Sequence, residues 1–469
     1  MKLYNTLTRS IDQFKPQSGN HVKMYTCGLT VYSQPQIGNW VAYIYSDVLT
    51  RALLQSGFEV ERVQNITDVG HLVSDDDNGE DKMQKGARKE GKTAWEIADK
   101  YIAIADDEAY TQLGLLRPNK LVRATDLIPE QIAFVQELEA KGFTYIIPNE
   151  GVYFDTSKLS DYGKLAQLDI EGLRAGARVI VDGKRNITDF ALWKFSPKDE
   201  QRDMEWESPF GDDKGMGFPG WHLECSVIAR QNLGDQLDLH TGGIDHIPVH
   251  HTNEIAQTEA VTGKQFVRHW FHNNFIKVNN TKLSKSLGNS YTLQDIQDKG
   301  FSLDALKTLV LSSHYRTEGN FSWEILEAAQ NRLNKWRAAM DLLWQEDVAA
   351  DKDFNSQVYA DKITAALQDD LNTPQALTVI DEAVSTLEQL HVNAVAIQAF
   401  ADSVKEQLGI DLLAGKSDIT DDQKTILLQR SVAREAKNWA ESDSLRDQLL
   451  SEGITVRDVG SGQVWSRTD

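Results

Sequence analysis

The fold is decided by the sequence Val22–Val31, VKMYTCGLTV, whose β-branched and aromatic residues with a single charged side chain predict a buried strand. A turn-rich stretch follows at Ser33–Asn39, SQPQIGN. Trp40–Gln55 then has the apolar spacing of a helix, and Phe58–Ile66 returns to a strand pattern. A strand, a glycine-containing loop, a helix and a second strand predict an α/β fold with a doubly wound parallel sheet and a ligand at the loop.

The middle of the chain departs from this parallel pattern. Leu127–Lys141 predicts a helix, and Phe143–Ile147 with Val152–Phe154 predicts an antiparallel hairpin. Because an antiparallel hairpin interrupts a parallel fold, we expect an inserted α+β subdomain over residues 121–214.

The first sheet is expected to continue after the insertion. Asp238–His240 and Phe275–Val278 both have strand-like patterns, and we expect them to complete it. The Rossmann-like domain is therefore predicted to be split between residues 1–120 and 215–290.

The C-terminal part is predicted to be almost entirely helical. Apolar residues recur at steps of three and four from Leu326 to Leu343, a stripe that must face other helices. A small hairpin is expected at the end, formed by Ile454–Val459 and Gln463–Ser466. The expected divisions are a connecting region over 291–325, a helical bundle over 326–410 and a small mixed α/β domain over 411–469.

Composition narrows the class of protein. The 469 residues include 49 Lys and Arg against 70 Asp and Glu, a net charge of −21, which argues against indiscriminate DNA binding. Two cysteines cannot form a disulfide framework in a chain of this length. The start, MKLYNTLTRS, lacks the apolar stretch of a secretory signal, and no apolar run is long enough for a membrane helix. We expect a cytoplasmic protein with no membrane or DNA partner.

The two cysteines are candidate metal ligands, because a polar cluster lies near the second of them in sequence. Cys27 closes the first strand, and Cys225 precedes a histidine-rich stretch in which His250 and Glu254 lie four residues apart, on one face of a helix. Two thiolates, an imidazole and a carboxylate suit tetrahedral Zn²⁺. Three other interpretations remain open: a purely structural zinc, a histidine-rich helix that caps a core, and two buried cysteines acting as small hydrophobic residues.

Two further segments have the character of phosphate-binding loops. Gly38, in the turn Gln36–Asn39, allows close backbone approach to a phosphate at the start of a helix. Lys282 and Lys285 lie three residues apart among small hydroxyl residues and suit a loop that clamps a polyphosphate. The alternatives are an ordinary capped turn and a solvated surface loop.

Several motifs taken together resemble class I aminoacyl-tRNA synthetases, and among them the cysteinyl-tRNA synthetase family. The resemblance runs nearly end to end and keeps the order of the family. The motifs are TCGLTVY (26–32), PQIGN (35–39), NITDV (65–69), GARV (176–179), DFALWK (189–194), PGWHLECS (219–226), HTGGIDHIPVHHTNEIAQ (240–257), KLSKSLGN (282–289), SSHYR (312–316), DDLNTPQAL (369–377) and AREAKNWAESDSLRDQL (433–449).

The resemblance implies a role for individual residues. The zinc ligands, for one ion per chain, would be Cys27, Cys225, His250 and Glu254. Catalytic roles fall on Gln36, Asn39, Lys282 and Lys285. ATP contacts fall on Gly38, Ser284, Lys285 and Ser286, and substrate contacts on Thr30 and Trp221. The anticodon contacts would be Arg434, Trp439, Asp443 and Asp458.

The implied activity is ATP-dependent ligation of L-cysteine to tRNA(Cys) through a cysteinyl-adenylate, with Mg²⁺ accompanying ATP and zinc binding the substrate thiolate in preference to serine. We expect a monomer. The chain departs from the family at Gln36, where the loop usually begins with His, so that a neutral amide replaces a group able to carry charge. Asn39 replaces the second His of that loop, and Leu283 replaces the usual Met; we interpret both as benign.

Two other functions are compatible with these motifs. One is a cysteine ligase acting on a small amine such as an aminosugar, although relatives of that kind lack an anticodon-binding end and residues 433–467 argue against it. The other is a catalytically impaired tRNA-binding paralogue, in which Gln36 marks a dead site and the zinc is structural.

Overall fold

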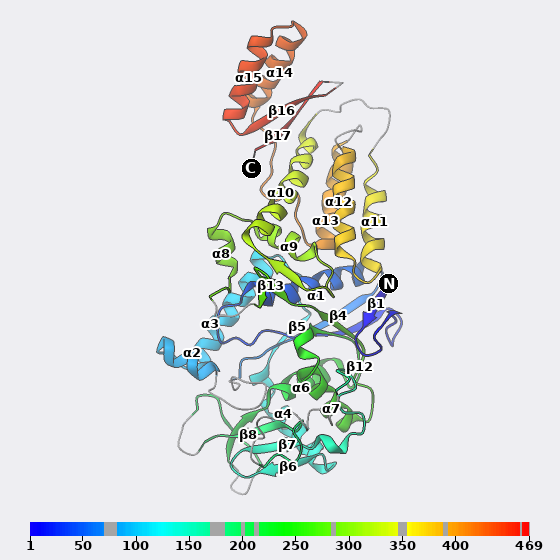
Figure 1. Cartoon of the computed structure of the whole chain (residues 1–469), viewed down its shortest axis with the longest axis vertical. Coiled ribbons are helices and arrows are strands. Elements are labelled where there is room, and N and C mark those ends of the chain that lie inside the picture. Colours follow the sequence, from blue (N-terminus) through cyan, green and yellow to red (C-terminus); the bar gives the residue numbers. More distant parts are fainter. Residues whose placement is uncertain are drawn as a thin grey trace. The chain divides into compact units, whose positions relative to one another are not determined.

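The computed structural model describes residues 1–69, 82–168, 183–197, 202–210, 215–282, 288–345, 354–387, 393–459 and 462–468. The chain divides into two compact units (Figure 1). The first comprises residues 1–46, 57–275 and 285–293, and the second comprises 47–56, 276–284 and 294–469.

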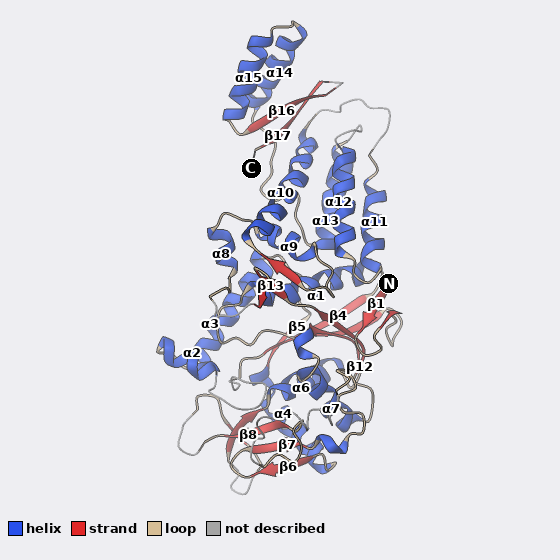
Figure 2. Ribbon diagram, in the orientation of Figure 1, coloured by secondary structure: helices blue, strands red, loops and turns tan. Residues whose placement is uncertain are grey.

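A parallel five-stranded sheet forms the centre of the first unit (Figure 2). Its strands, in spatial order, are β12 (Val267–Asn273), β11 (Leu237–Gly243), β3 (His21–Thr26), β4 (Glu59–Ile66) and β5 (Lys120–Arg123). Every neighbouring pair in this sheet is parallel. The α/β fold with a doubly wound parallel sheet is thereby confirmed.

Helix α1 (Ile37–Gln55) follows β3, as expected, but begins three residues before the predicted start at Trp40. Ile37 is buried and enters the first turn, while the Asn39 side chain accepts a hydrogen bond from the backbone N–H of Gln36 at 2.9 Å. The turn Gln36–Asn39 is therefore the N-terminus of α1 itself, and the N–H groups of Asn39 and Trp40 both donate to the carbonyl of Gln36.

Strand β3 ends at Thr26, five residues before the predicted end at Val31. Gly28 explains why the chain leaves the ladder, since a Cβ at this position would lie 1.7 Å from the carbonyl oxygen of Asn65. The chain approaches β4 too closely there for any side chain. It then returns only as an isolated parallel bridge between Thr30 and Thr67.

A second, antiparallel sheet has the order β6-β7-β8-β10-β9 and lies mostly within the expected insertion, although β10 begins beyond its expected end at residue 214. Its strands are β6 (Thr144–Ile147), β7 (Gly151–Phe154), β8 (Phe190–Phe195), β10 (Met216–Pro219) and β9 (Trp206–Glu207). The predicted hairpin is β6–β7, and the predicted helix is α4 (Ile128–Ala140). Phe154 and Phe190 stack with ring centroids 5.1 Å apart in the core between α4 and this sheet. The expected divide after residue 120 falls inside strand β5.

One strand prediction is wrong. Phe275–Val278 was expected to complete the parallel sheet, but β13 (Ile276–Val278) pairs with β14 (Thr281–Lys282) and β15 (Gly319–Phe321) in a separate three-stranded sheet. The parallel sheet is completed instead by β12, which precedes β13 directly. A short apolar run indicates a strand but does not indicate its partner.

The second unit is mainly helical, as predicted. Its described helices include α9 (Leu303–Leu311), α10 (Trp323–Met340), α11 (Ser356–Gln368), α12 (Thr373–Leu387), α13 (Ala394–Leu408), α14 (Asp421–Glu435) and α15 (Trp439–Ser451). The predicted stripe on α10 is buried at Leu326, Leu333, Trp336 and Met340. The expected terminal hairpin is β16 (Ile454–Val459) with β17 (Gly462–Arg467). Among the described residues, no helix is long and apolar enough to span a bilayer.

Candidate metal centre and active site

The four predicted metal ligands lie together at the carboxyl end of the parallel sheet. Cys27 directly follows β3, and Cys225 lies on α6 (Trp221–Leu233). His250 begins α7 (His250–Thr262), and Glu254 lies one turn later on the same helix. One donor atom from each of the four lies within 4.8 Å of the others. The grouping inferred from sequence is therefore present as a spatial cluster.

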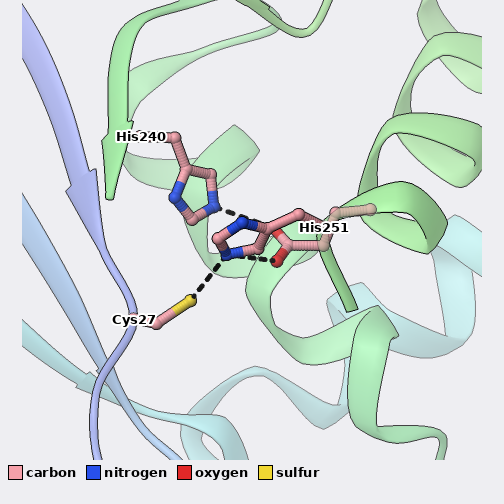
Figure 3. Close-up of side chains that lie close together, drawn as sticks. Cys27, His240 and His251 are labelled. Atoms are coloured by element: carbon pink, nitrogen blue, oxygen red, sulfur yellow. Dashed lines mark hydrogen bonds and ion pairs between the residues drawn. The ribbon is translucent and has the colours of Figure 1, made fainter. Parts of the chain in front are cut away.

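A second set of potential ligands shares two members with the first. Cys27 and Glu254 also lie within 4.8 Å of His240 and His251. Figure 3 shows Cys27 pointing toward His251, with the sulfur 3.3 Å from Nε2. Glu254 Oε2 lies 3.1 Å from Nε2 of His240, while its Oε1 lies 3.1 Å from Nε2 of His250. His240 and His251 were not predicted as ligands, although both lie in or beside the histidine-rich stretch that precedes and begins α7.

Neighbouring side chains orient the imidazoles. His222 on α6 lies with its Nδ1 3.0 Å from Nδ1 of His250, which leaves Nε2 of His250 directed at Glu254. His251 Nδ1 contacts Nε2 of His272 at 2.7 Å, and His272 in turn contacts Thr6. Such outer contacts fix the orientation and tautomer of metal-binding histidines.

The electrostatics of the cluster favour negative charge on two of the ligands. A hydrogen bond with Cys27 outweighs burial and lowers the pKa of Cys225 to about 7, while the same contact raises the pKa of Cys27. Burial disfavours the Glu254 carboxylate, but His240 and His250 outweigh it and lower the pKa of Glu254 to about 2. Burial opposes charge on His250 as well, yet Glu254 and Cys225 raise its pKa to about 10.

The donor set fits a zinc ion. Bonds of about 2.0–2.3 Å in tetrahedral geometry place ligand atoms roughly 3.3–3.8 Å apart, a spacing that the 4.8 Å cluster accommodates with small movements. Two sulfurs with one imidazole and one carboxylate are ligands typical of zinc rather than of Mg²⁺ or Ca²⁺. The cluster is a candidate metal centre, and its residues suit Zn²⁺.

Of the two predicted substrate-binding residues, Trp221 contacts this centre, and Thr30 lies close to one of its ligands in sequence. Trp221 begins α6, and its ring centroid lies 4.6 Å from that of His250. Thr30 lies three residues after Cys27, in the segment that bridges to Thr67 on the way into the loop before α1.

The predicted ATP loop is held by contacts on several sides. The Ile37 N–H donates to the carbonyl of Tyr291 at 2.8 Å, and Asn39 is engaged in the contact with Gln36. Gly38 lies in the first turn of α1, at the helix N-terminus.

The second predicted loop is only partly described. Lys282 ends β14, opposite Lys277 of β13, and is exposed. Ser284, Lys285 and Ser286 lie outside the described residues, as does the GARV motif at 176–179.

Three of the four predicted anticodon residues gather on the C-terminal helices and hairpin. Asp458 of β16 forms an ion pair with Arg434 of α14 at 2.8 Å. The Arg434 guanidinium lies 5.7 Å from the ring centroid of Trp439. Trp439 is 56% exposed at the start of α15. Asp443 pairs instead with Arg446 at 3.3 Å. Arg430, buried and bonded to Asp458 at 2.9 Å, supports this cluster and was missed by the sequence analysis.

Family models match three parts of the chain. Residues 13–331 match the catalytic domain of class I (C) tRNA synthetases, residues 362–412 match a DALR domain, and residues 416–465 match the anticodon-binding domain of cysteinyl-tRNA ligase. The fold and site therefore define an aminoacyl-tRNA synthetase of class I.

Curated relatives give the particular family. The chain is 44% identical over 468 residues to "Cysteine--tRNA ligase 1" of Burkholderia lata, covering 99% of this chain and 96% of that protein. It is 38% identical to the cysteine–tRNA ligase of Treponema denticola, covering 100% and 99% of the two chains. The chain belongs to the cysteine–tRNA ligase family.

Solved structures support the fold. A Mycobacterium tuberculosis methionyl-tRNA synthetase in complex with methionyl-adenylate superposes with a TM-score of 0.59 at 13% identity, covering 83% of this chain and 92% of that one. At this identity the likeness establishes the class I fold and no more.

Proposed function

We propose that this protein ligates L-cysteine to tRNA(Cys) at the expense of ATP, through a cysteinyl-adenylate, in the cytoplasm. The observation that supports this most is the convergence of Cys27, Cys225, His250 and Glu254 at the end of the parallel sheet of a class I domain. We propose that these four residues hold one Zn²⁺ per chain.

The metal centre accounts for substrate selection. Cysteine and serine differ by one atom, and a hydrophobic pocket separates such near-isosteres by only about 1–3 kcal/mol. Zinc held at this centre would bind a thiolate in preference to a hydroxyl. Trp221, packed on His250, would form one wall beside the bound amino acid and exclude water from it.

The N-terminus of α1 accounts for ATP binding. Its positive dipole end would face the phosphates, and Gly38 leaves room for close approach. In the proposed reaction the substrate carboxylate attacks the α-phosphorus of ATP, the bond to pyrophosphate breaks, and cysteinyl-adenylate forms. Positioning of the two reactants and stabilisation of charge, with Gln36 as a neutral donor and Lys282 and Lys285 on the leaving pyrophosphate, would provide the rate.

The C-terminal cluster accounts for recognition of tRNA. Unstacked anticodon bases stack on exposed aromatic rings and guanidinium planes, and Trp439 with Arg434 offers both. The charge of Asp458 is balanced by Arg430 and Arg434, whose combined effect keeps its pKa below the usual range. Asp458 therefore stays charged near neutral pH, and its ion pairs hold the side chains of the cluster in place.

Cysteine-dependent exchange between ATP and pyrophosphate tests the first half-reaction directly. We expect exchange with cysteine and little with serine, followed by transfer of labelled cysteine to tRNA(Cys) and none to an aminosugar. Background exchange in a protein that holds one equivalent of zinc would overturn the enzymatic function. Transfer to an aminosugar but not to tRNA would overturn the choice of acceptor.

A further inference from the structure

One buried carboxylate contacts the chain on both sides of the proposed ATP loop. Glu108 is 3% exposed. Its Oε1 accepts a hydrogen bond from Nε2 of Gln34 at 3.1 Å, and its Oε2 accepts one from Nε1 of Trp40, also at 3.1 Å. Gln34 lies two residues before the segment Gln36–Asn39, and Trp40 directly follows it. The same side chain therefore brackets the loop.

The backbone that carries Glu108 is unusual. It belongs to η1 (Asp107–Gln112), a π-helical turn that directly continues α3 (Ala94–Asp106). A π-turn adds a residue to the helical repeat and re-aims the side chains that follow, and such turns are frequent at functional sites. Here the turn carries Glu108 as a buried acidic side chain.

The partners of Glu108 are both neutral N–H donors. Burial raises the pKa of this carboxyl, and the hydrogen bonds from Gln34 and Trp40 oppose that effect. A buried carboxylate destabilises the fold unless its hydrogen bonds are retained. The two hydrogen bonds of Glu108 therefore matter more than contacts at the surface would. Trp40 is itself fully buried, with its ring 5.2 Å from that of Tyr43, and cannot reorient without disturbing α1.

We propose that Glu108 is a positioning residue for ATP: by holding Gln34 and Trp40, it fixes the Gln36–Asn39 segment, which forms the start of α1. This inference rests on the proposed function. Glu108 contacts no reacting group itself and acts through the loop. The tether from Ile37 to Tyr291 holds the middle of the segment, and Glu108 holds its two ends.

The test separates binding of ATP from binding of cysteine. ATP–pyrophosphate exchange is measured with each substrate varied in turn, for wild type, Glu108→Ala, Glu108→Gln and Trp40→Phe, together with zinc content and melting temperature. Glu108→Ala should raise the KM for ATP by about tenfold, leave the KM for cysteine within about twofold, and keep one zinc. Glu108→Gln retains one acceptor oxygen and should show a smaller rise.

The matched control is Asp189→Asn. Asp189 is also a buried carboxylate bonded to neutral donors, Tyr145 at 2.8 Å and Thr156 at 2.8 Å, but it lies in the inserted part of the chain. This variant should lower the melting temperature without changing the KM for ATP. If the Glu108 variants behave as the control does, or raise both KM values together, the proposal is wrong.

Two further measurements test the proposal if Glu108→Ala does not fold or if wild type shows no exchange. Should Glu108→Ala fail to fold, Trp40→Phe decides, because it keeps an aromatic side chain but removes the indole N–H that Glu108 accepts; an unchanged KM for ATP in that variant overturns the proposal. If wild type shows no exchange, the proposed function fails separately, and calorimetric Kd values for ATP replace KM. A Kd that is equal for wild type and Glu108→Gln, or absent from both, overturns the positioning role.

Discussion

The Glu254 carboxylate lies 3.1 Å from Nε2 of His250, one turn earlier on α7, and an equal distance from Nε2 of His240 on β11. A single side chain therefore connects the two overlapping sets of metal ligands. Only one of those sets contains Cys225 and His250, so mutagenesis can distinguish them.

Cys225→Ser should lose stoichiometric zinc, because a serine hydroxyl is a poor replacement for a thiolate ligand. Metal content of the purified protein, measured by mass spectrometry, checks this. The matched control is His251→Asn, which removes a member of the other set and should retain one equivalent. The reverse result, zinc kept by Cys225→Ser and lost by His251→Asn, would place the ion among Cys27, His240, His251 and Glu254.

Gln36→His should change ATP–pyrophosphate exchange by no more than about threefold near pH 7.5, because an imidazole is mostly neutral there and the amide already donates a hydrogen bond. Gln36→Ala should lower kcat by about tenfold or more, since it removes the donor that we propose acts on the reacting phosphate. The two variants are compared at saturating cysteine. Equal activity of wild type and Gln36→Ala would show that Gln36 has no catalytic role.

Asp68 should make stability depend on pH in an unusual direction. Burial raises the pKa of this carboxyl to about 6, so between about pH 4 and 6 the folded state holds a proton that the unfolded chain has released. The free energy of unfolding should therefore fall as pH rises through this window, by about 2–3 kcal/mol in all, and be level above it. Urea unfolding of wild type and Asp68→Asn across the window checks this, with a flatter profile in the variant.

Thr125→Val provides the internal check on that assignment. The Thr125 hydroxyl donates to Asp68 at 2.6 Å and lowers the pKa of Asp68. Without that hydroxyl the pKa should rise further, and the fall in stability should extend to higher pH. An unchanged window in Thr125→Val would assign the slope to another group.

Trp439→Ala should lower kcat/KM for tRNA by about tenfold to a hundredfold, because stacking of a base on an aromatic ring contributes about 1–3 kcal/mol. ATP–pyrophosphate exchange should be unaffected. Leu450→Ala is the control, as it removes another exposed apolar side chain from α15, 52% exposed. If both variants charge tRNA as wild type does, Trp439 does not read the anticodon.

Local patterns predicted most of the fold. The strands β3 and β4, helix α1 and the β6–β7 hairpin follow from apolar periodicity and turn residues within short windows. The assignment of β13 to the parallel sheet was wrong because strand pairing is a non-local property, and a three-residue strand carries too little pattern to specify its partner.

The candidate site could be predicted where rare residue types and their spacing indicate a particular chemistry. Rare cysteines with a His–Glu pair four apart marked the metal cluster. His240 and His251 were not assigned, because their distances to Cys27 depend on how β11 ends and how α7 packs. Glu108 carried no signal at all, since its two donors are 68 and 74 residues away in sequence.

The separation of the metal ligands along the chain has a consequence for biosynthesis. Cys27 emerges from the ribosome early, but Glu254 follows only after more than half of the 469 residues have been made. In the folded sheet β11 lies beside β3, and α7, which carries His250 and Glu254, follows β11 along the chain. The metal site can therefore form only after α7 has been made, and a truncated nascent chain ending before α7 should remain metal-free.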